Sequence, residues 1–153
     1  MINNGAVVLQ YCPAEQEDIA VILEQCEMLI LRYEDLASID LPKVLAWVEN
    51  KIRSNVDRYV CVKQCNQKVA YYHLEKGNTE AELDDLYVLP EFRGNGIGSQ
   101  ILHDCIAATD LPIFLYVFKN NTAAIDLYQR FGFRITESVG QTRLIMRLDR
   151  EKR

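Results

Sequence analysis

A glycine-rich stretch between a strand pattern and an amphipathic helix pattern most constrains how this chain can fold. The stretch is Arg93-Gly94-Asn95-Gly96-Ile97-Gly98-Ser99. Residues 81–89 before it have the pattern of a strand that Pro90 closes, and the residues after it carry apolar side chains at helical spacing. The glycines leave backbone N–H groups unobstructed at a helix N-terminus, where partial positive charge favours an anion. Arg93 adds a full positive charge at the rim, so this turn is predicted to hold a phosphate.

Length and composition limit the class of protein. The chain has 153 residues, 49% of them apolar and 25% charged, and we expect residues 1–153 to form a single domain. The net charge of −5 argues against a nucleic-acid partner, since phosphate backbones are bound by clustered Lys and Arg. No run of about 18 apolar residues is present, so no membrane partner is expected. Residues 1–5 lack the basic start and apolar core of a secretory signal.

Cysteine usage indicates a reducing compartment. The five cysteines are odd in number, lie in apolar patterns and have no partners at zinc-site spacing. We therefore expect a cytoplasmic protein without a metal, in which the following residues are reduced and packed: Cys12, Cys26, Cys61, Cys65 and Cys105.

Hydrophobic periodicity predicts the order of strands and helices. The strands are expected over 6–12, 58–64, 68–75, 81–88, 113–118, 133–137 and 142–148. The helices are expected to open at 13–15, to run from 44 to about 55, to follow the glycine turn, and to cover 123–131. Hairpins in the middle and at the end of the chain imply antiparallel pairing, whereas the strand–helix–strand unit over 81–118 implies one parallel pair. The predicted fold is α/β, a mixed and mostly antiparallel sheet of about seven strands with helices on both faces.

Three phosphate-binding patterns compete for the glycine turn. A P-loop closes with a Lys-Ser/Thr pair, and Gly98-Ser99 has no such lysine. A dinucleotide fingerprint places its third glycine one position later, where Ser99 stands. The third pattern, Arg-x-x-Gly-x-Gly, is matched by Arg93, Gly96 and Gly98 directly after the predicted strand over 81–88. It resembles the signature of the GCN5-related N-acetyltransferase (GNAT) family.

A second motif extends this resemblance into the C-terminal half. Asn121-x-x-Ala124-x-x-x-Tyr128, followed by Phe131-Gly132-Phe133, is similar to the family's other cofactor-side motif. The order of the predicted elements over residues 6–148 also matches the family's fold. The resemblance implies a GNAT-like acyl-CoA N-acyltransferase fold with acetyl-CoA as co-substrate.

The resemblance also implies which residues hold acetyl-CoA. The family's pyrophosphate contacts correspond to Arg93, Gly94, Asn95, Gly96, Ile97, Gly98 and Ser99. The preceding strand, with Leu86, Tyr87 and Val88, would lie alongside the pantetheine and part from the strand over 113–118 to admit the thioester. The backbone N–H of Val88 would polarise the acetyl carbonyl. Asn121 and Tyr128 would complete the cofactor contacts.

Direct acyl transfer needs a neutral amine, a polarised thioester and a proton for the leaving thiolate. Tyr128 matches the family's usual acid, and a phenol with a pKa of roughly 10 can protonate a thiolate of similar basicity. The alternative is a tyrosine that packs its helix against the sheet. Asn121 would bind the pantetheine, cap its own helix, or do both.

The acidic strand before the glycine turn offers candidates for the base. On an unbroken strand, Glu82, Asp84, Leu86 and Val88 share one face. Glu82 matches the position of the catalytic glutamate in the family's histone-acetylating branch. Asp84 and Asp85 are alternatives, because a bulge would change which residues share a face. A water relay could also remove the proton, and the acidic strand could instead be a solvated surface that only attracts a cationic amine.

The acceptor pocket is expected to draw on a helical segment and on the central hairpin. The candidate lining residues are Tyr33, Glu34 and Trp47 of the first and Tyr71, Tyr72 and His73 of the second. His73 is also an alternative base, and each of these side chains is a packing residue on the simpler interpretation. Acidic residues near this mouth suit a polyamine, an aminoglycoside or a peptide amine.

The sequence therefore predicts an acetyl-CoA-dependent N-acetyltransferase that moves an acetyl group directly to a primary amine of a small molecule or peptide. No metal and no covalent intermediate are expected. One alternative is a non-catalytic acyl-CoA-binding sensor or assembly module on the same fold, and another is an enzyme that uses a longer acyl-CoA. The last strands offer an edge for a homodimer. The sequence selects neither the acceptor amine nor the oligomeric state.

Overall fold

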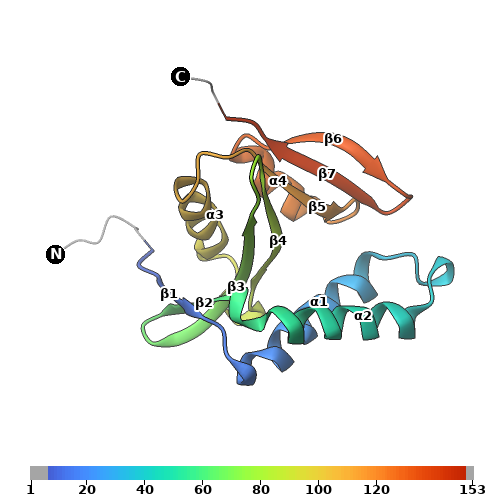
Figure 1. The fold of residues 1–153 in the computed structure, drawn as a ribbon, viewed down its shortest axis with the longest axis horizontal. Helices are drawn as coiled ribbons and strands as arrows, with labels where there is room; N and C mark the ends of the chain where they lie inside the picture. The colour runs from blue at the N-terminus through green and yellow to red at the C-terminus, as the bar shows by residue number, and fades with distance from the viewer. Residues whose placement is uncertain (1–6, 151–153) are drawn as a thin grey trace.

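Seven strands form one mixed sheet in the computed structural model, which describes residues 7–150. The strands are β1 (Gln10–Pro13), β2 (Val60–Gln64), β3 (Gln67–Lys76), β4 (Ala81–Val88), β5 (Ile113–Phe118), β6 (Arg134–Val139) and β7 (Arg143–Leu148). Their order is β1-β2-β3-β4-β5-β7-β6, and the only parallel neighbours among the strands of the described residues are β4 and β5 (Figure 1). The predicted mixed, mostly antiparallel sheet is confirmed.

Helices cover both faces of the sheet, as predicted. The α-helices are α1 (Ile19–Tyr33), α2 (Leu41–Asn55), α3 (Ile97–Ala107) and α4 (Thr122–Arg130). Short 3-10 turns connect them to the strands at η1 (Gln16–Asp18), η2 (Leu36–Ser38), η3 (Val56–Arg58) and η4 (Pro90–Phe92). One apolar core lies between the sheet and α1 and α2, and a second lies between the sheet and α3 and α4. None of the helices formed by residues 7–150 has the length and apolar character that a membrane span requires.

The first helix begins later than predicted. Ala14 N–H donates to the Tyr59 carbonyl at 2.9 Å, so pairing with the neighbouring strand continues past Pro13. Pro13 on β1 stands opposite Val60 on β2. Because β1 is an edge strand, the missing N–H of Pro13 is tolerated. The prediction that residues 13–15 open the helix is therefore wrong, and α1 starts at Ile19 after a 3-10 turn. Ala6 of the predicted strand over 6–12 lies outside the described residues.

The β2–β3 hairpin closes on a tight turn at Cys65 and Asn66. Their φ angles are +50° and +65°, a left-handed pair that suits a two-residue hairpin turn. Cys65 is consequently exposed, which contradicts its prediction as a packing residue. The other cysteines are buried or half-buried, and all five are free thiols.

The central strand β4 contains a bulge. His73 pairs with Asp85 and Leu74 pairs with Leu83, so Asp84 is an extra residue on β4. On its other side, β4 pairs with β5 only at Ala81 with Ile113 and at Glu82 with Phe114. The two strands therefore part immediately before the bulge, which confirms the predicted separation of the parallel pair.

The bulge changes which β4 side chains share a face. Ala81 and Leu83 pack in the α3/α4 core, and Leu86 and Val88 pack against that same core beyond the bulge. Glu82 alternates with its neighbours Ala81 and Leu83 and therefore faces α1 and α2. The strand is not unbroken, so the expectation that Glu82 shares a face with Leu86 and Val88 is wrong.

Candidate active site

The glycine turn joins η4 to the start of α3 in a conformation that few residues other than glycine adopt. Gly94 has φ +81° and Gly96 has φ +80°, both in the left-handed region. Gly96 is the N-cap of α3, and no side chain of residues 7–150 caps the N–H groups of the first helical turn. These N–H groups are orphaned donors at the positive end of the helix dipole. The turn therefore fits an anion, as the sequence predicts.

The side chain of Arg93 is tied to the end of β4. Its Nε donates to the Val88 carbonyl at 3.0 Å. Asn95 Nδ2 donates to the carbonyls of Phe92 and Arg93 at 3.2 and 3.3 Å. These bonds fix the glycine turn against the strand that precedes it.

The free edge of β4 presents backbone groups to the gap left by β5. Leu89 N–H donates to the Val69 carbonyl at 2.9 Å, and the ladder then pairs Val88 with Ala70. In an antiparallel ladder hydrogen-bonded and non-hydrogen-bonded pairs alternate. The N–H and C=O groups of Val88 and Leu86 therefore point away from β3. This edge can pair with the amides of an extended ligand.

Helix α4 closes the same region from the side of α3. A Cβ placed on Gly98 would lie 3.6 Å from both Leu127 Cδ2 and Val88 Cγ2, so α3, α4 and β4 converge there. Asn121 caps α4, because its Oδ1 accepts from Ala124 N–H at 3.3 Å. The capping half of the Asn121 prediction is confirmed.

Tyr128 lies in α4 with its ring 5.7 Å from the ring of Phe133, and it is 9% exposed. Burial raises the pKa of Tyr128 above its usual range, and the charges of Asp85 and Cys105 add to that rise. The phenol therefore remains protonated across the neutral range and has a proton to donate, and the same rise makes it a weaker acid than an exposed tyrosine.

Two of the three β4 carboxylates are bound by neighbouring side chains. Asp84 Oδ2 lies 2.8 Å from Lys51 Nζ, and Asp85 accepts hydrogen bonds from the hydroxyls of Tyr87, at 2.7 Å, and Tyr59. Burial alone would raise the pKa of Asp84, but the neighbouring His73 and Lys51 side chains outweigh it and hold that pKa below its usual value. Asp84 is therefore a weak base.

Glu82 differs from both aspartates. It forms no ion pair with any of residues 7–150, and burial raises its pKa, with Asp84 adding to the rise and Lys51 and His73 opposing it. Glu82 lies six positions before Val88, which is at most about 20 Å along the strand. Glu82 is thus a competent base, but it does not contact a group that is bound at the Val88 N–H.

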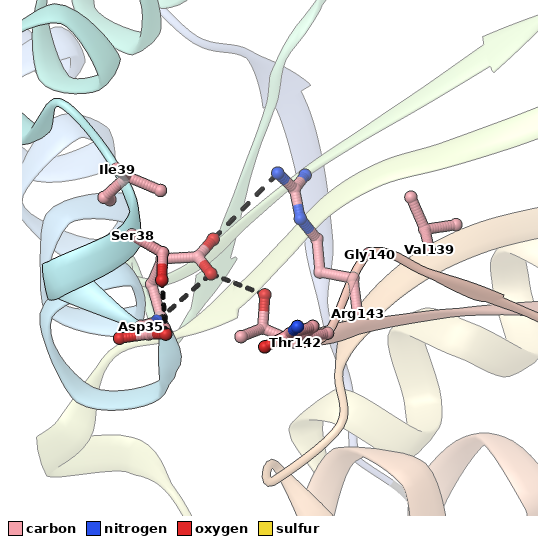
Figure 2. A pocket seen from close by; sticks show the side chains of 9 residues that line it. Asp35, Ser38, Ile39, Val139, Gly140, Thr142 and Arg143 are labelled. Atoms are coloured by element: carbon pink, nitrogen blue, oxygen red, sulfur yellow. Dashed lines mark hydrogen bonds and ion pairs between the residues drawn. The ribbon is translucent and has the colours of Figure 1, made fainter.

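A pocket of about 340 Å³ opens between the α1–α2 connection and the β6–β7 turn (Figure 2). The carboxylate of Glu34, whose side chain is 9% exposed, accepts hydrogen bonds from the Thr142 hydroxyl and from Asp35 N–H. Arg143 Nη2 lies 4.0 Å from Glu34 Oε2, and Asp35 is bonded to the Ser38 hydroxyl at 2.6 Å. The pocket therefore holds two carboxylates and one guanidinium.

The other expected acceptor residues are distributed differently. Tyr33 stacks on Phe118 at the end of β5, next to the pocket, with ring centroids 6.0 Å apart. Trp47 is 65% exposed on α2. Tyr71 and His73 are 1% and 6% exposed and serve as packing residues, so neither is placed to touch a substrate. Tyr72 packs edge-on against Tyr11, with ring centroids 5.9 Å apart.

Thr142 and Arg143 were not among the site residues predicted from the sequence. They follow a turn at Gly140 whose only signal is the glycine itself. Their place beside Glu34 depends on how the last hairpin packs against the α1–α2 connection, which no local pattern reports.

Comparison with known proteins gives a consistent family. The sequence profile of the acetyltransferase (GNAT) family matches residues 22–133. Mycothiol acetyltransferase of Streptomyces griseus is 38% identical over 46% of this chain and 25% of its own length. Spermine/spermidine N(1)-acetyltransferase of Bacillus subtilis is 35% identical over 41% of this chain and 45% of its own length. The chain thus spans less than half the length of these curated relatives.

Solved structures share the fold. The PaiA N-acetyltransferase of Thermoplasma acidophilum in complex with coenzyme A superposes with a TM-score of 0.70. The match covers 94% of this chain and 99% of that one at 17% identity. At this identity the similarity shows the fold alone.

Proposed function

We propose that this chain, which belongs to the acetyltransferase (GNAT) family, transfers an acetyl group from acetyl-CoA directly to a primary amine. The observation that carries the proposal is the gap between β4 and β5, which pair at only two positions. The rest of β4 leads from this gap to the glycine turn, where residues 7–150 leave the first N–H groups of α3 without a side-chain cap. A pyrophosphate at the turn and an extended pantetheine along β4 would match the donors that these two features present.

Each part of the site has a role in holding the co-substrate. Acetyl-CoA supplies an activated acetyl thioester. Arg93 and the backbone from Gly94 to Ser99 bind its pyrophosphate, since the N–H groups at the start of α3 and the positive charge of Arg93 both favour an anion. Leu86, Tyr87 and Val88 offer the strand edge for the pantetheine amides, and Asn121 borders the same region at the start of α4.

The transfer step needs a donor at the carbonyl, a proton for sulfur and a base for the amine. Val88 N–H polarises the acetyl carbonyl, and the Leu86 N–H, which points the same way nearer the bulge, is the alternative donor. Tyr128 gives its proton to the departing thiolate as the C–S bond breaks and the C–N bond forms. A chain of several water molecules carries the proton of the amine to Glu82, because the strand geometry keeps Glu82 from direct contact.

Substitution of Gly96 tests the phosphate-binding turn. In Gly96→Ala the new side chain strains a residue at φ +80°, and we expect acetyl-CoA to bind roughly tenfold more weakly. Gly140→Ala is the matched control, because Gly140 also has positive φ, at +59°, but lies in the β6–β7 turn. Isothermal titration with acetyl-CoA measures both; equal losses in the two variants would contradict the assignment.

The pocket around Glu34 supports an acceptor that carries a second positive charge. Its two carboxylates outnumber the single guanidinium of Arg143, and the Glu34 carboxylate is largely removed from water. A buried carboxylate favours a cationic partner. The pocket lies where Tyr33 meets the end of β5, so an amine reaching the gap between β4 and β5 would keep a distal ammonium near Glu34. Diamines and polyamines have this form, and one matched relative is named for spermine and spermidine.

Two measurements test the proposal. Isothermal titration should detect acetyl-CoA binding, and an absence of binding at millimolar concentration would overturn the function. A panel of amines is then assayed for release of free CoA, with each diamine paired to a monoamine of equal length. We expect turnover, and faster turnover with the diamines. Binding of acetyl-CoA without turnover on any amine would favour a non-catalytic acyl-CoA sensor. A faster rate with longer acyl-CoA donors would favour an enzyme that uses a longer acyl-CoA.

A further inference from the structure

A side chain from α2 holds the bulge in β4, although α2 carries none of the residues assigned to acetyl-CoA. Lys51 Nζ lies 2.8 Å from Asp84 Oδ2 and 3.7 Å from Asp85 Oδ2. The side chains of Lys51, Asp84 and Asp85 are 23%, 22% and 11% exposed. The ion pairs are therefore shielded from solvent, unlike surface pairs, which contribute little.

Other elements bind the same two carboxylates. Asp85 receives hydroxyl hydrogen bonds from Tyr59, which precedes β2, and from Tyr87 on β4. His73 on β3 places Nδ1 3.4 Å from Asp84 Oδ2, and its Nε2 lies 2.9 Å from Glu75 Oε2. His73 Nδ1 has no hydrogen-bond partner within residues 7–150, so Lys51 provides the closest contact to Asp84.

The contacts to Asp84 and Asp85 lie where β4 separates from β5, next to the proposed cofactor site. The last β4–β5 pair is Glu82 with Phe114, and the bulge at Asp84 follows at once. Beyond it come Leu86 and Val88, the residues whose backbone faces the gap. Whatever fixes Asp84 and Asp85 therefore fixes the direction in which β4 leaves β5.

We propose that Lys51 is a positioning residue that tethers the β4 bulge to α2 and thereby sets the shape of the gap that receives acetyl-CoA. The inference rests on the proposed cofactor site. Without the tether, the bulge keeps its pairing with β3 and the Tyr59 hydrogen bond to Asp85, but no ion pair fixes it to α2. The bulge can then shift relative to α2. The backbone donors of Leu86 and Val88 then lose their alignment with the glycine turn. Binding geometry of this kind is sensitive to displacements of about 1 Å.

The test measures acetyl-CoA binding by isothermal titration, so it needs no knowledge of the acceptor. In Lys51→Met, which keeps the length of the side chain but removes the ammonium, we expect affinity to fall about tenfold. Lys51→Arg keeps the charge and should bind within about twofold of the wild type. Ile52→Val is the control for lost stability, because Ile52 is the neighbouring residue on α2 and is 1% exposed. It should lower the melting temperature and leave affinity unchanged.

A double variant separates tethering from charge compensation. Lys51→Met leaves two carboxylates without their lysine and is expected to be less stable; Lys51→Met/Asp84→Asn removes one of those charges and should regain stability. The tether is still absent, so acetyl-CoA affinity should stay low. Wild-type affinity in a folded Lys51→Met or in the double variant would overturn the inference and leave the proposed function intact. If the wild type itself does not bind acetyl-CoA, both proposals fail.

Discussion

Replacement of Tyr128 by Phe should lower the turnover number by about a hundredfold and leave the dissociation constant of acetyl-CoA almost unchanged. The substitution keeps the ring that packs 5.7 Å from Phe133 and removes only the hydroxyl. General acid catalysis by a positioned side chain contributes at least about this factor. Since burial raises the pKa of Tyr128, the wild-type phenol keeps its proton through the assay range, and the loss should be nearly independent of pH. The turnover number is measured by the release of free CoA, and the dissociation constant of acetyl-CoA is measured by isothermal titration.

Tyr116→Phe is the matched control for this variant. Tyr116 lies on β5 and is 45% exposed, so its hydroxyl is available to water and not committed to the core. It should retain wild-type turnover. Unchanged turnover in Tyr128→Phe would remove Tyr128 from the mechanism and leave it as a packing residue.

Replacement of Glu82 by Gln should lower kcat/KM at neutral pH on the order of a hundredfold, as expected for loss of a general base. Glu82 must be ionised to accept a proton, so wild-type activity should fall as pH drops through its folded pKa. Burial places that pKa above the usual carboxyl value, and the acid limb should therefore appear at a higher pH than for an exposed glutamate. Glu82→Gln should lose this limb. The measurement is kcat/KM against pH for both proteins.

Glu80→Gln serves as the control for Glu82. Glu80 directly precedes β4 and its carboxylate is bonded to Arg147 at 2.7 Å, so it shares the neighbourhood but is already paired. Its pH profile should match the wild type. If Glu82→Gln keeps both the rate and the acid limb, another group or water alone removes the proton.

Features set by local sequence were predictable. The continuous apolar run at 113–118 has the same limits as β5, and Asn121 was a predicted cap of α4. The glycine turn was recognisable because positions such as Gly96 need a left-handed conformation that other residues resist. In each case the signal and the structure involve the same few residues.

Features set by packing between distant segments were not predictable. The bulge at Asp84 arises from the register of β4 against β3, and no residue of β4 marks it. Pro13 appeared to open a helix, but the edge position of β1 makes it acceptable in a strand. Lys51 had no distinguishing pattern on its helix, since its contacts at Asp84 and Asp85 lie more than thirty residues further along the chain.

The short β4–β5 ladder leaves a seam in the sheet, which is the unpaired stretch between these two strands beyond Glu82 and Phe114. Strands β1 to β4 lie on one side and β5, β7 and β6 on the other, and only two residue pairs join β4 to β5 (Figure 1). An extended substrate lying in the seam would form backbone hydrogen bonds with the free edge of β4 and so extend the ladder from that side. The edge of β4 beyond Glu82 would then be paired only while the carrier is bound, and departure of the spent carrier would leave this edge unpaired again.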